Sequence, residues 1–508
     1  MNRTPAAGPD LPPAAQPRLP APAAFQALAL AAFAGVVVAV AGTAAGTRAI
    51  YYLAILGAIA IGGLVALTRR EPLRFAFLSL LAVLPMVEAP VPPGRMGMNV
   101  FDATLLAIAM VLVARRFAVR QPDRLPLFPS RSFAWAWLLL TVCAIVSRSP
   151  ADSALALLAA VAVYTFFLCS LQELRRPDGF GRLAAIWAAA TIVVSLGLFI
   201  DHFFHVNLSF RGGNLNQLTH LSGREVWRAG GFFQDPQKAG AFLASMIAFL
   251  AVLAARGRFP GWPMRLLLWC AVAAGIAALF TTIARGAIVA CLAVTALSLF
   301  AFNRWHPAAK MLAAAAFATA LLAAALVPAD AWLDLLPADV AARFAHVEEE
   351  FRIRLMIWFD TWDMFASHPL TGVGPGAFQS YLLETRPGMS GYYGIGAAAG
   401  VPYVPEQPEN GYLTVLYEGG LLGSAAALLV AGAALRRAAR VLAGGPGVVQ
   451  ARTETIAALA GLATFCITFT TLFTAGDSRI AALLMFLLAV IWRHATPADA
   501  PAQPCMRA

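Results

Sequence analysis

The chain has 508 residues, of which 60% are hydrophobic and only 12% are charged, and its mean hydropathy is +0.73. Soluble globular proteins carry about 25% charged residues, so this composition excludes an ordinary soluble enzyme and indicates a membrane protein with many spans. The net charge of +11 raises the alternative of a nucleic-acid partner, which the positions of the basic residues can test.

The N-terminal segment 1–23 is rich in Pro and Ala and predicts a disordered tail. It is not typical of a cleavable signal, because the first apolar stretch starts too late and is too long. All but one of the six cysteines lie inside apolar stretches. We therefore expect the cysteines to be small apolar residues within helices, and we expect neither a disulfide framework nor a metal site.

A helix that crosses a bilayer needs about 20 mostly apolar residues. Such stretches occur at 24–42, 49–67, 74–88, 98–114, 133–148, 152–172, 181–203, 236–255, 264–282, 284–302, 308–327, 411–434, 452–474 and 478–494. They predict an all-α polytopic membrane protein with about 14 (roughly 12–14) transmembrane helices, because the third and fourth stretches are short enough to be tilted or re-entrant.

The basic residues predict an orientation for these spans. With a cytoplasmic N-terminus and alternating spans, most of the 37 Lys and Arg residues fall in short cytoplasmic loops, as the positive-inside rule requires. We therefore expect both termini in the cytoplasm and no nucleic-acid partner. The basic residues that remain outside are the candidates for chemistry.

Two external segments are long, 201–236 and 328–410, and long loops in compact architectures are usually functional. The second is a large, partly helical loop that precedes the last three helices. The expected organisation is a tail (1–23), N-terminal helices 1–7 (24–200), a catalytic-type core that holds both external segments (201–434), and C-terminal helices with a short cytoplasmic tail (435–508).

Two external arginines lie next to helix ends. Arg228 precedes Gly230-Gly231 and the helix-start signal Asp235-Pro236, and an arginine beside a helix N-terminus suits a phosphate. Arg285 lies between two apolar helices with almost no loop, a costly position unless the residue is paired or faces water. The alternative is that each arginine extends to the membrane interface.

The long external segment begins with an amphipathic helix. Its apolar residues recur at three- and four-residue steps: Phe344, Val347, Phe351, Leu355, Trp358, Trp362 and Phe365. This helix is expected to lie along the membrane or to cap the bundle, with Arg354 at the apolar edge and Arg352 about a quarter turn away. The glycine-rich run 372–376 follows a helix and no strand, so it predicts a tight turn and not a nucleotide-binding loop.

Before the next predicted span, two carboxylates, an amide and a phenol project from one loop: Glu406, Glu409, Asn410 and Tyr412. A carboxylate there is either a helix N-cap or a general base over a pocket. The external histidines lack metal-ligand spacing, and the external segments contain no Asp-x-Asp motif. We therefore expect no metal and no other cofactor.

Together these segments resemble the O-antigen ligase/polymerase family of bacterial inner-membrane glycosyltransferases over roughly residues 200–430. The resembling motifs are Arg228-Ala-Gly-Gly-Phe-Phe-Gln-Asp-Pro236, Ala284-Arg-Gly286, Arg354-Leu-Met-Ile-Trp358, His368-Pro-Leu-Thr-Gly-Val-Gly-Pro-Gly-Ala-Phe378, Glu409-Asn-Gly-Tyr-Leu413 and Glu418-Gly-Gly-Leu-Leu-Gly423. The resemblance implies metal-independent transfer of a glycan from an undecaprenyl diphosphate carrier to a hydroxyl acceptor, on the periplasmic face of the inner membrane. The acceptor is the lipid A core in a ligase and a second lipid-linked glycan in a polymerase.

The resemblance also implies site residues. Arg228 and Arg285 match the two diphosphate-binding arginines of the family, and they would neutralise the leaving group. Four further residues are expected to contact the diphosphate or the rest of the substrate: Arg354, Arg352, Asn410 and Tyr412.

The expected general base departs from the family pattern. Glu409 occupies the position where the family usually has a histidine. A carboxylate can deprotonate a hydroxyl, with Glu406 and His368 as substitutes. Two alternatives remain open: Glu409 serves only as a helix cap, or the chain belongs to a branch of the family with a different acceptor.

Two other classes of membrane protein remain as alternatives. A transporter or lipid-linked oligosaccharide flippase also has 12–14 helices, but it would show repeated halves and charges in mid-helix. We find no halves of comparable pattern in the sequence, and charges in mid-helix are nearly absent. A structural membrane subunit is the remaining alternative, and the sequence does not separate a polymerase from a ligase.

Overall fold

The computed structural model describes residues 72–86, 99–118, 127–206, 208–209, 218–221, 224–233, 235–259, 261–302, 347–385, 408–444, 449–471 and 476–494. The predicted tail 1–23, the predicted spans 24–42, 49–67 and 308–327, and part of the external segment 328–410 lie outside these ranges.

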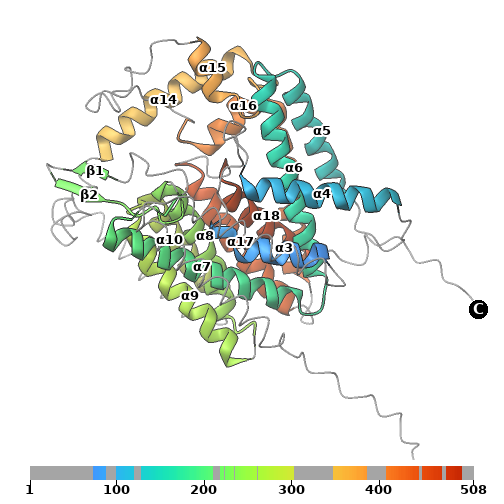
Figure 1. Ribbon diagram of the computed structural model, residues 1–508, viewed down its shortest axis with the longest axis vertical. Helices are drawn as coiled ribbons and strands as arrows, with labels where there is room; N and C mark the ends of the chain where they lie inside the picture. Colours follow the sequence, from blue (N-terminus) through green and yellow to red (C-terminus); the bar gives the residue numbers. More distant parts are fainter. Residues whose placement is uncertain are drawn as a thin grey trace, which may run out of the picture.

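The first half of the described chain consists of helices joined by short connections (Figure 1). They are α3 (Pro72–Ala82), the short 3-10 helix η1 (Leu84–Met86), α4 (Val100–Ala118), α5 (Arg131–Ile145), α6 (Pro150–Leu174) and α7 (Gly179–Phe204). An antiparallel hairpin follows, formed by β1 (Leu218–Leu221) and β2 (Arg224–Trp227), with Leu218 opposite Trp227. The hairpin was not predicted, because the segment 201–236 was interpreted only as a long external connection.

The second half is again helical. It contains α8 (Pro236–Ala255), α9 (Trp262–Thr281), α10 (Arg285–Phe302), α14 (Val347–Ser367), α15 (Phe378–Thr385), α16 (Gly411–Ala443), α17 (Val449–Thr468) and α18 (Ser478–Arg493). The described residues are thus helical apart from one hairpin, which confirms the all-α class. The amphipathic helix predicted around Arg354 is α14.

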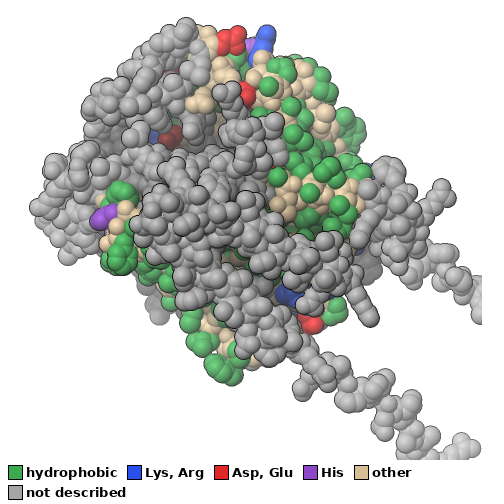
Figure 2. All heavy atoms as spheres, viewed as in Figure 1, with side chains coloured by type: hydrophobic (Ala, Val, Ile, Leu, Met, Phe, Trp, Pro, Cys, Tyr) green, Lys and Arg blue, Asp and Glu red, His purple; other side chains and the backbone are tan. Residues whose placement is uncertain are grey.

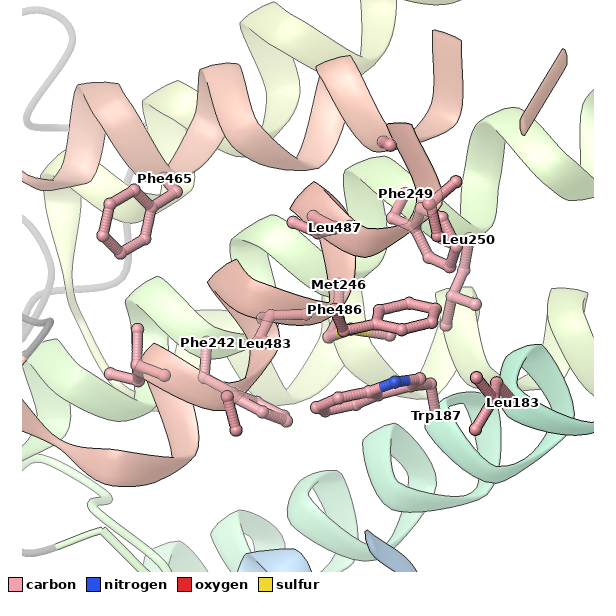
Figure 3. Packing of buried hydrophobic residues seen from close by; sticks show 14 of the residues in the cluster. Leu183, Trp187, Phe242, Met246, Phe249, Leu250, Phe465, Leu483, Phe486 and Leu487 are labelled. Atoms are coloured by element: carbon pink, nitrogen blue, oxygen red, sulfur yellow. The ribbon is translucent and has the colours of Figure 1, made fainter. Parts of the chain in front are cut away.

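Helix α8 forms the centre of the core and packs against α9, α10 and α17. It is apolar on every face, and such a helix is stable only when other helices surround it. Aromatic rings fill the space beside it (Figure 3). Phe486 of α18 lies between Trp187 of α7 and Phe249 of α8, with ring centroids 5.3 and 5.5 Å away. Residues distant in the sequence therefore fix α7, α8 and α18 together.

Five helices in the described part are long and apolar enough to cross a membrane: α6, α7, α8, α9 and α16. Shorter apolar helices, including α5, accompany them. Hydrophobic side chains cover the surface where α5 and α6 lie (Figure 2), and Trp135, Leu138 and Ile145 of α5 are exposed. A row of exposed apolar residues on one face fits contact with lipid. The chain is a multi-pass membrane protein, while the predicted total of about 14 spans is not confirmed.

Arginines at the helix ends gather around two buried glutamates. Glu173 of α6 accepts hydrogen bonds from Arg74 and Arg182. Glu454 of α17 pairs with Arg258 at 2.7 Å and with Arg493 at 3.1 Å. A buried carboxylate is costly unless it is paired. Some of the arginines that predicted the orientation therefore also join helix ends to one another.

Helix α16 is broken at Gly420 (φ 59°, ψ −157°). Its 33 residues would span about 50 Å as a straight helix, against a hydrocarbon core of about 30 Å. The break divides it into a short segment before Gly420 and a longer segment that ends at Ala443. The longer segment alone is sufficient to cross a bilayer, so the break allows the beginning of α16 to belong to the site.

Residues 369–374 fill the break in α16. Amides of the loop bond to helix carbonyls, Val373 N to Tyr417 O at 3.1 Å and Gly374 N to Glu418 O at 2.9 Å. In the other direction, Leu421 N donates to Pro369 O at 2.9 Å. The backbone groups that the break releases are thereby satisfied, which a buried backbone requires. The glycine-rich run is a turn, as predicted, and its role is to support α16.

Candidate active site

The segment that carries Arg228 is fixed to the end of α7. The carboxylate of Asp201, in the last turn of α7, accepts hydrogen bonds from Gly230 N at 2.8 Å and Gly231 N at 2.7 Å. Trp227 Nε1 donates to the same carboxylate at 2.9 Å. Gly231 has φ +58°, a conformation that favours glycine. This turn leads into α8, where Asp235 is the N-cap as predicted and accepts a bond from Gln237 N at 2.7 Å.

Arg228 is buried, with only 3% of its surface exposed. Its Nε donates to the carbonyl oxygen of Thr282 at 3.3 Å, and Ala229 N donates to Thr281 O at 3.1 Å. Thr282 is the C-cap of α9, and Arg285 begins α10 three residues later. The fold therefore brings the two predicted diphosphate-binding arginines to one short turn, although they lie on different segments of the chain.

The turn between α9 and α10 is strained. Ile283 has φ +51°, which is unusual for a β-branched residue. Arg285 follows as the first residue of α10, at the positive end of the helix dipole, where a cation is unfavourable and an anion is favoured. Backbone strain of this kind persists where the surrounding structure holds it, often at functional sites. The turn is thus suited to an anionic group.

On the opposite side of the site, α14 contacts the entrance of α16. Arg354 Nη2 lies 3.2 Å from Glu409 Oε2, and about a fifth of each side chain is exposed. One helical turn later, Trp358 Nε1 donates to Pro408 O at 3.0 Å. These two contacts hold α14 against residues 408–409. The predicted cation and the predicted base therefore form an ion pair.

Asn410 is the N-cap of α16, because its side-chain oxygen accepts from Tyr412 N at 3.0 Å and Leu413 N at 3.2 Å. Glu409 does not provide this cap; its backbone is left-handed (φ +52°) and its carboxylate faces Arg354. The hydroxyl of Tyr412 donates to Cys466 O at 2.9 Å. Asn410 and Tyr412, predicted as substrate contacts, thus first of all shape and anchor the start of α16.

The end of α17 joins the two sides of the site. Gly411 N donates to Phe469 O at 2.8 Å. Thr471 borders the start of α10, since a Cβ added at Gly286 would lie 3.3 Å from its Cγ2. Residues 469–471 therefore touch both the residue after Asn410 and the residue after Arg285. The segments that carry Glu409 and Arg285 therefore both pack against the residues that follow α17.

His368 lies in a different place. Its Nε2 accepts a hydrogen bond from Arg148 Nε at 3.2 Å, and its Nδ1 is 2.9 Å from the hydroxyl of Ser367. It follows the C-terminus of α14, about 20 Å along the helix from Arg354 at 1.5 Å per residue. Burial and the charge of Arg148 lower the pKa of His368. The structure does not bring His368 to Glu409.

Glu406 and Arg352 are the remaining predicted site residues. Glu406 lies outside the described residues, and Arg352 belongs to α14, two positions before Arg354. Within the described ranges, no three His, Cys, Asp or Glu side chains are grouped to hold a metal ion. The metal-independent reaction stays a prediction.

Sequence reasoning missed Asp201 and the pair formed by Asp477 and Arg479. The signal for Asp201 was present, because it is a carboxylate near the end of a predicted apolar span, and ionisable residues in such spans are candidates for function. Arg479 Nη1 donates to Phe232 O at 2.8 Å, and its Nη2 pairs with Asp477 at 2.7 Å. Burial opposes ionisation of Asp477, but Arg479 and Lys238 hold its pKa below the usual value.

A comparison with known families covers part of this site. Residues 270–428 match the family model described as O-antigen ligase, which confirms the resemblance found in the sequence. The matched segment includes Arg285, Arg354, His368, Glu409 and Asn410, whereas Arg228 precedes it. No curated protein matches the chain.

Proposed function

We propose, on the premise that this chain carries an O-antigen ligase domain, that it transfers a glycan from an undecaprenyl diphosphate carrier to a hydroxyl acceptor. The observation that supports this proposal most is the contact of Arg228 with Thr282. This contact places the buried Arg228 at the turn that carries Arg285 and the N-terminus of α10. A diphosphate is the type of ligand that such a positive site fits.

The proposed reaction is a substitution at the anomeric carbon of the donor. The bond between this carbon and the diphosphate oxygen breaks, and a new bond forms to the acceptor oxygen. The diphosphate leaves with the bonding electrons, and the guanidinium groups of Arg228 and Arg285 stabilise its growing negative charge. Forked arginines have the geometry to bind phosphate oxygens, and we propose that the reaction proceeds without a metal.

The acceptor hydroxyl has to lose a proton in the same reaction, and we propose that the carboxylate of Glu409 accepts it as the general base. Its carboxylate is oriented by Arg354 and is relieved of helix capping by Asn410. Glu409 precedes the N-cap of α16 and has a left-handed backbone, so it is not part of that helix. A positioned carboxylate contributes about 10²–10⁴-fold to a proton transfer of this kind.

We place the reaction on the periplasmic face of the bacterial inner membrane, with both termini in the cytoplasm. The distribution of the arginines supports this orientation. The ends of α6, α7, α17 and α18 that carry the Glu173 and Glu454 clusters would then face the cytoplasm. The site at the starts of α8, α10 and α16 lies at the opposite ends of the connected helices.

The broken helix α16 is a feature that transporters also use, because unwound backbone can line a transport pathway. In this chain the groups at the break bond to residues 369–374 of the same protein. They support a fixed loop, and this favours an enzyme over a carrier.

Deletion of the gene, with lipid-linked glycans and surface polysaccharide measured together, tests the proposal. Transfer predicts loss of the product and accumulation of the carrier-linked donor, restored by the intact gene. Accumulation of single repeat units would indicate a polymerase, and accumulation of full-length chains would indicate a ligase. Normal polysaccharide without accumulation would contradict the proposal. Purified protein should also release undecaprenyl diphosphate, which a flippase would not do.

A further inference from the structure

We infer that Asp201 is a positioning residue that sets the direction of Arg228 toward the diphosphate of the donor. The inference rests on the proposed function of Arg228. Asp201 lies in the last turn of α7 and is fully buried. An ionisable group in this position of an apolar helix is costly without specific partners, so its contacts indicate what it does.

The hydrogen-bond partners of Asp201 lie on both sides of Arg228 in the chain. One carboxylate oxygen accepts from the indole of Trp227, immediately before Arg228. The other accepts from the amides of Gly230 and Gly231, immediately after Ala229. An ionised carboxylate only accepts hydrogen bonds, and these three partners are all donors. The carboxylate therefore holds the chain on both sides of Arg228.

A second group holds the same turn from its other side. Arg479 donates to the carbonyl of Phe232 at 2.8 Å, and its guanidinium lies 3.8 Å from the ring centroid of Phe233. The turn also sits tightly on α7, since a Cβ added at Gly231 would lie 3.1 Å from the amide nitrogen of Leu198. Residues 230–233 are thus held from two sides, and this restrains the backbone next to Arg228.

Arg228 reaches the turn that carries Arg285, because its Nε bonds to Thr282 O. A guanidinium has five N–H donors in a fixed plane. Fixing Nε therefore fixes the plane of the guanidinium that would meet a phosphate. A group that is held in place before the ligand arrives loses less entropy on binding. Hydrogen bonds from Trp227, Gly230 and Gly231 partly offset the charge of Asp201, which limits its repulsion of the diphosphate.

Binding of farnesyl diphosphate to the purified full-length protein in detergent tests the inference. Asp201→Asn keeps the size of the side chain, but its amide N–H groups face other donors. We expect affinity to fall about 10-fold, as for loss of a hydrogen bond to a charged group. In an Arg228→Ala background the same change should have almost no further effect, because Asp201 acts through Arg228.

The matched control is Asp178→Asn, at the other end of α7, where the side chain makes no capping bond; it should bind as wild type. A purely structural role of Asp201 would weaken binding equally with and without Arg228, and this additive result would overturn the inference. Unchanged binding in Asp201→Asn would overturn it as well. Arg228→Ala with wild-type affinity would instead refute the proposed role of Arg228. If Asp201→Asn does not accumulate, Trp227→Phe removes one of the three bonds and should weaken binding about threefold.

Discussion

The guanidinium of Arg354 lies 3.2 Å from the carboxylate of Glu409, which joins α14 to the residue before the N-cap of α16. Helix α14 ends at Ser367, so residues 368–407 separate it in the chain from the loop that carries Glu409. The ion pair therefore makes the position of the proposed base depend on α14. A change in either residue should affect the other.

Replacing Glu409 by Gln should slow glycan transfer about 10²–10⁴-fold, because the amide cannot accept the proton of the acceptor. Binding of the lipid-linked donor should persist, since Arg228 and Arg285 are intact. Single-turnover transfer by the purified protein measures the first effect, and donor binding measures the second. Glu384→Gln, an exposed glutamate of α15, is the control. Equal product yields in Glu409→Gln and wild type would leave Glu409 without a catalytic role.

Arg228→Ala and Arg285→Ala should each lower the rate of transfer about 10²–10³-fold, as loss of one group that stabilises the leaving charge does. The protein should still accumulate in the membrane. Arg265→Ala is the control, because Arg265 bonds to Phe259 O near the start of α9, at the other end of that helix from Thr282. Polysaccharide analysis and quantitative immunoblots of the three variants check this prediction. Normal polysaccharide in both site variants would refute the diphosphate role.

Gly420→Ala should destabilise the protein by about 2 kcal/mol or more, because a left-handed backbone is costly for alanine and its Cβ would meet other atoms. That Cβ would lie 2.5 Å from Gly372 N and from Leu370 O. Gly419→Ala is a neighbouring control, since nothing lies within 4 Å of its added Cβ. Thermal unfolding in detergent should separate the two variants clearly. Similar unfolding temperatures would mean that the break in α16 is not required.

Acidification should destabilise the region around His368. Burial and Arg148 lower the pKa of His368 below its ordinary value of 6.5 in the folded protein, so the unfolded chain binds the proton more readily. The stability that the neutral histidine contributes is present above pH 6.5 and is lost as the pH falls through the folded pKa. Unfolding temperatures at several pH values measure this loss. His368→Gln should show a smaller loss than wild type, and an equal loss would assign the effect to other groups.

Much of the architecture follows from the sequence because the bilayer imposes simple rules on it. Apolar stretches of sufficient length predicted α6, α7, α8, α9 and the start of α16 to within a few residues. The Asp235-Pro236 signal predicted the beginning of α8, since capping is a local interaction. The hairpin was missed because its strands are only four residues long, and so short a strand gives a weak alternation of apolar and polar residues.

The arrangement of the candidate site depends on contacts between distant segments, which no local sequence pattern predicts. The sequence identified Arg228, Arg285, Arg354 and Glu409 as individual residues, because charges outside an apolar bundle need a reason. Only the tertiary structure showed that Arg228 bonds to the turn before Arg285 and that Glu409 pairs with Arg354 while Asn410 caps the helix. It also separated His368 from these residues. Periodicity and composition determine which segments are buried, whereas distances between segments are decided by how their side chains and backbone groups satisfy one another.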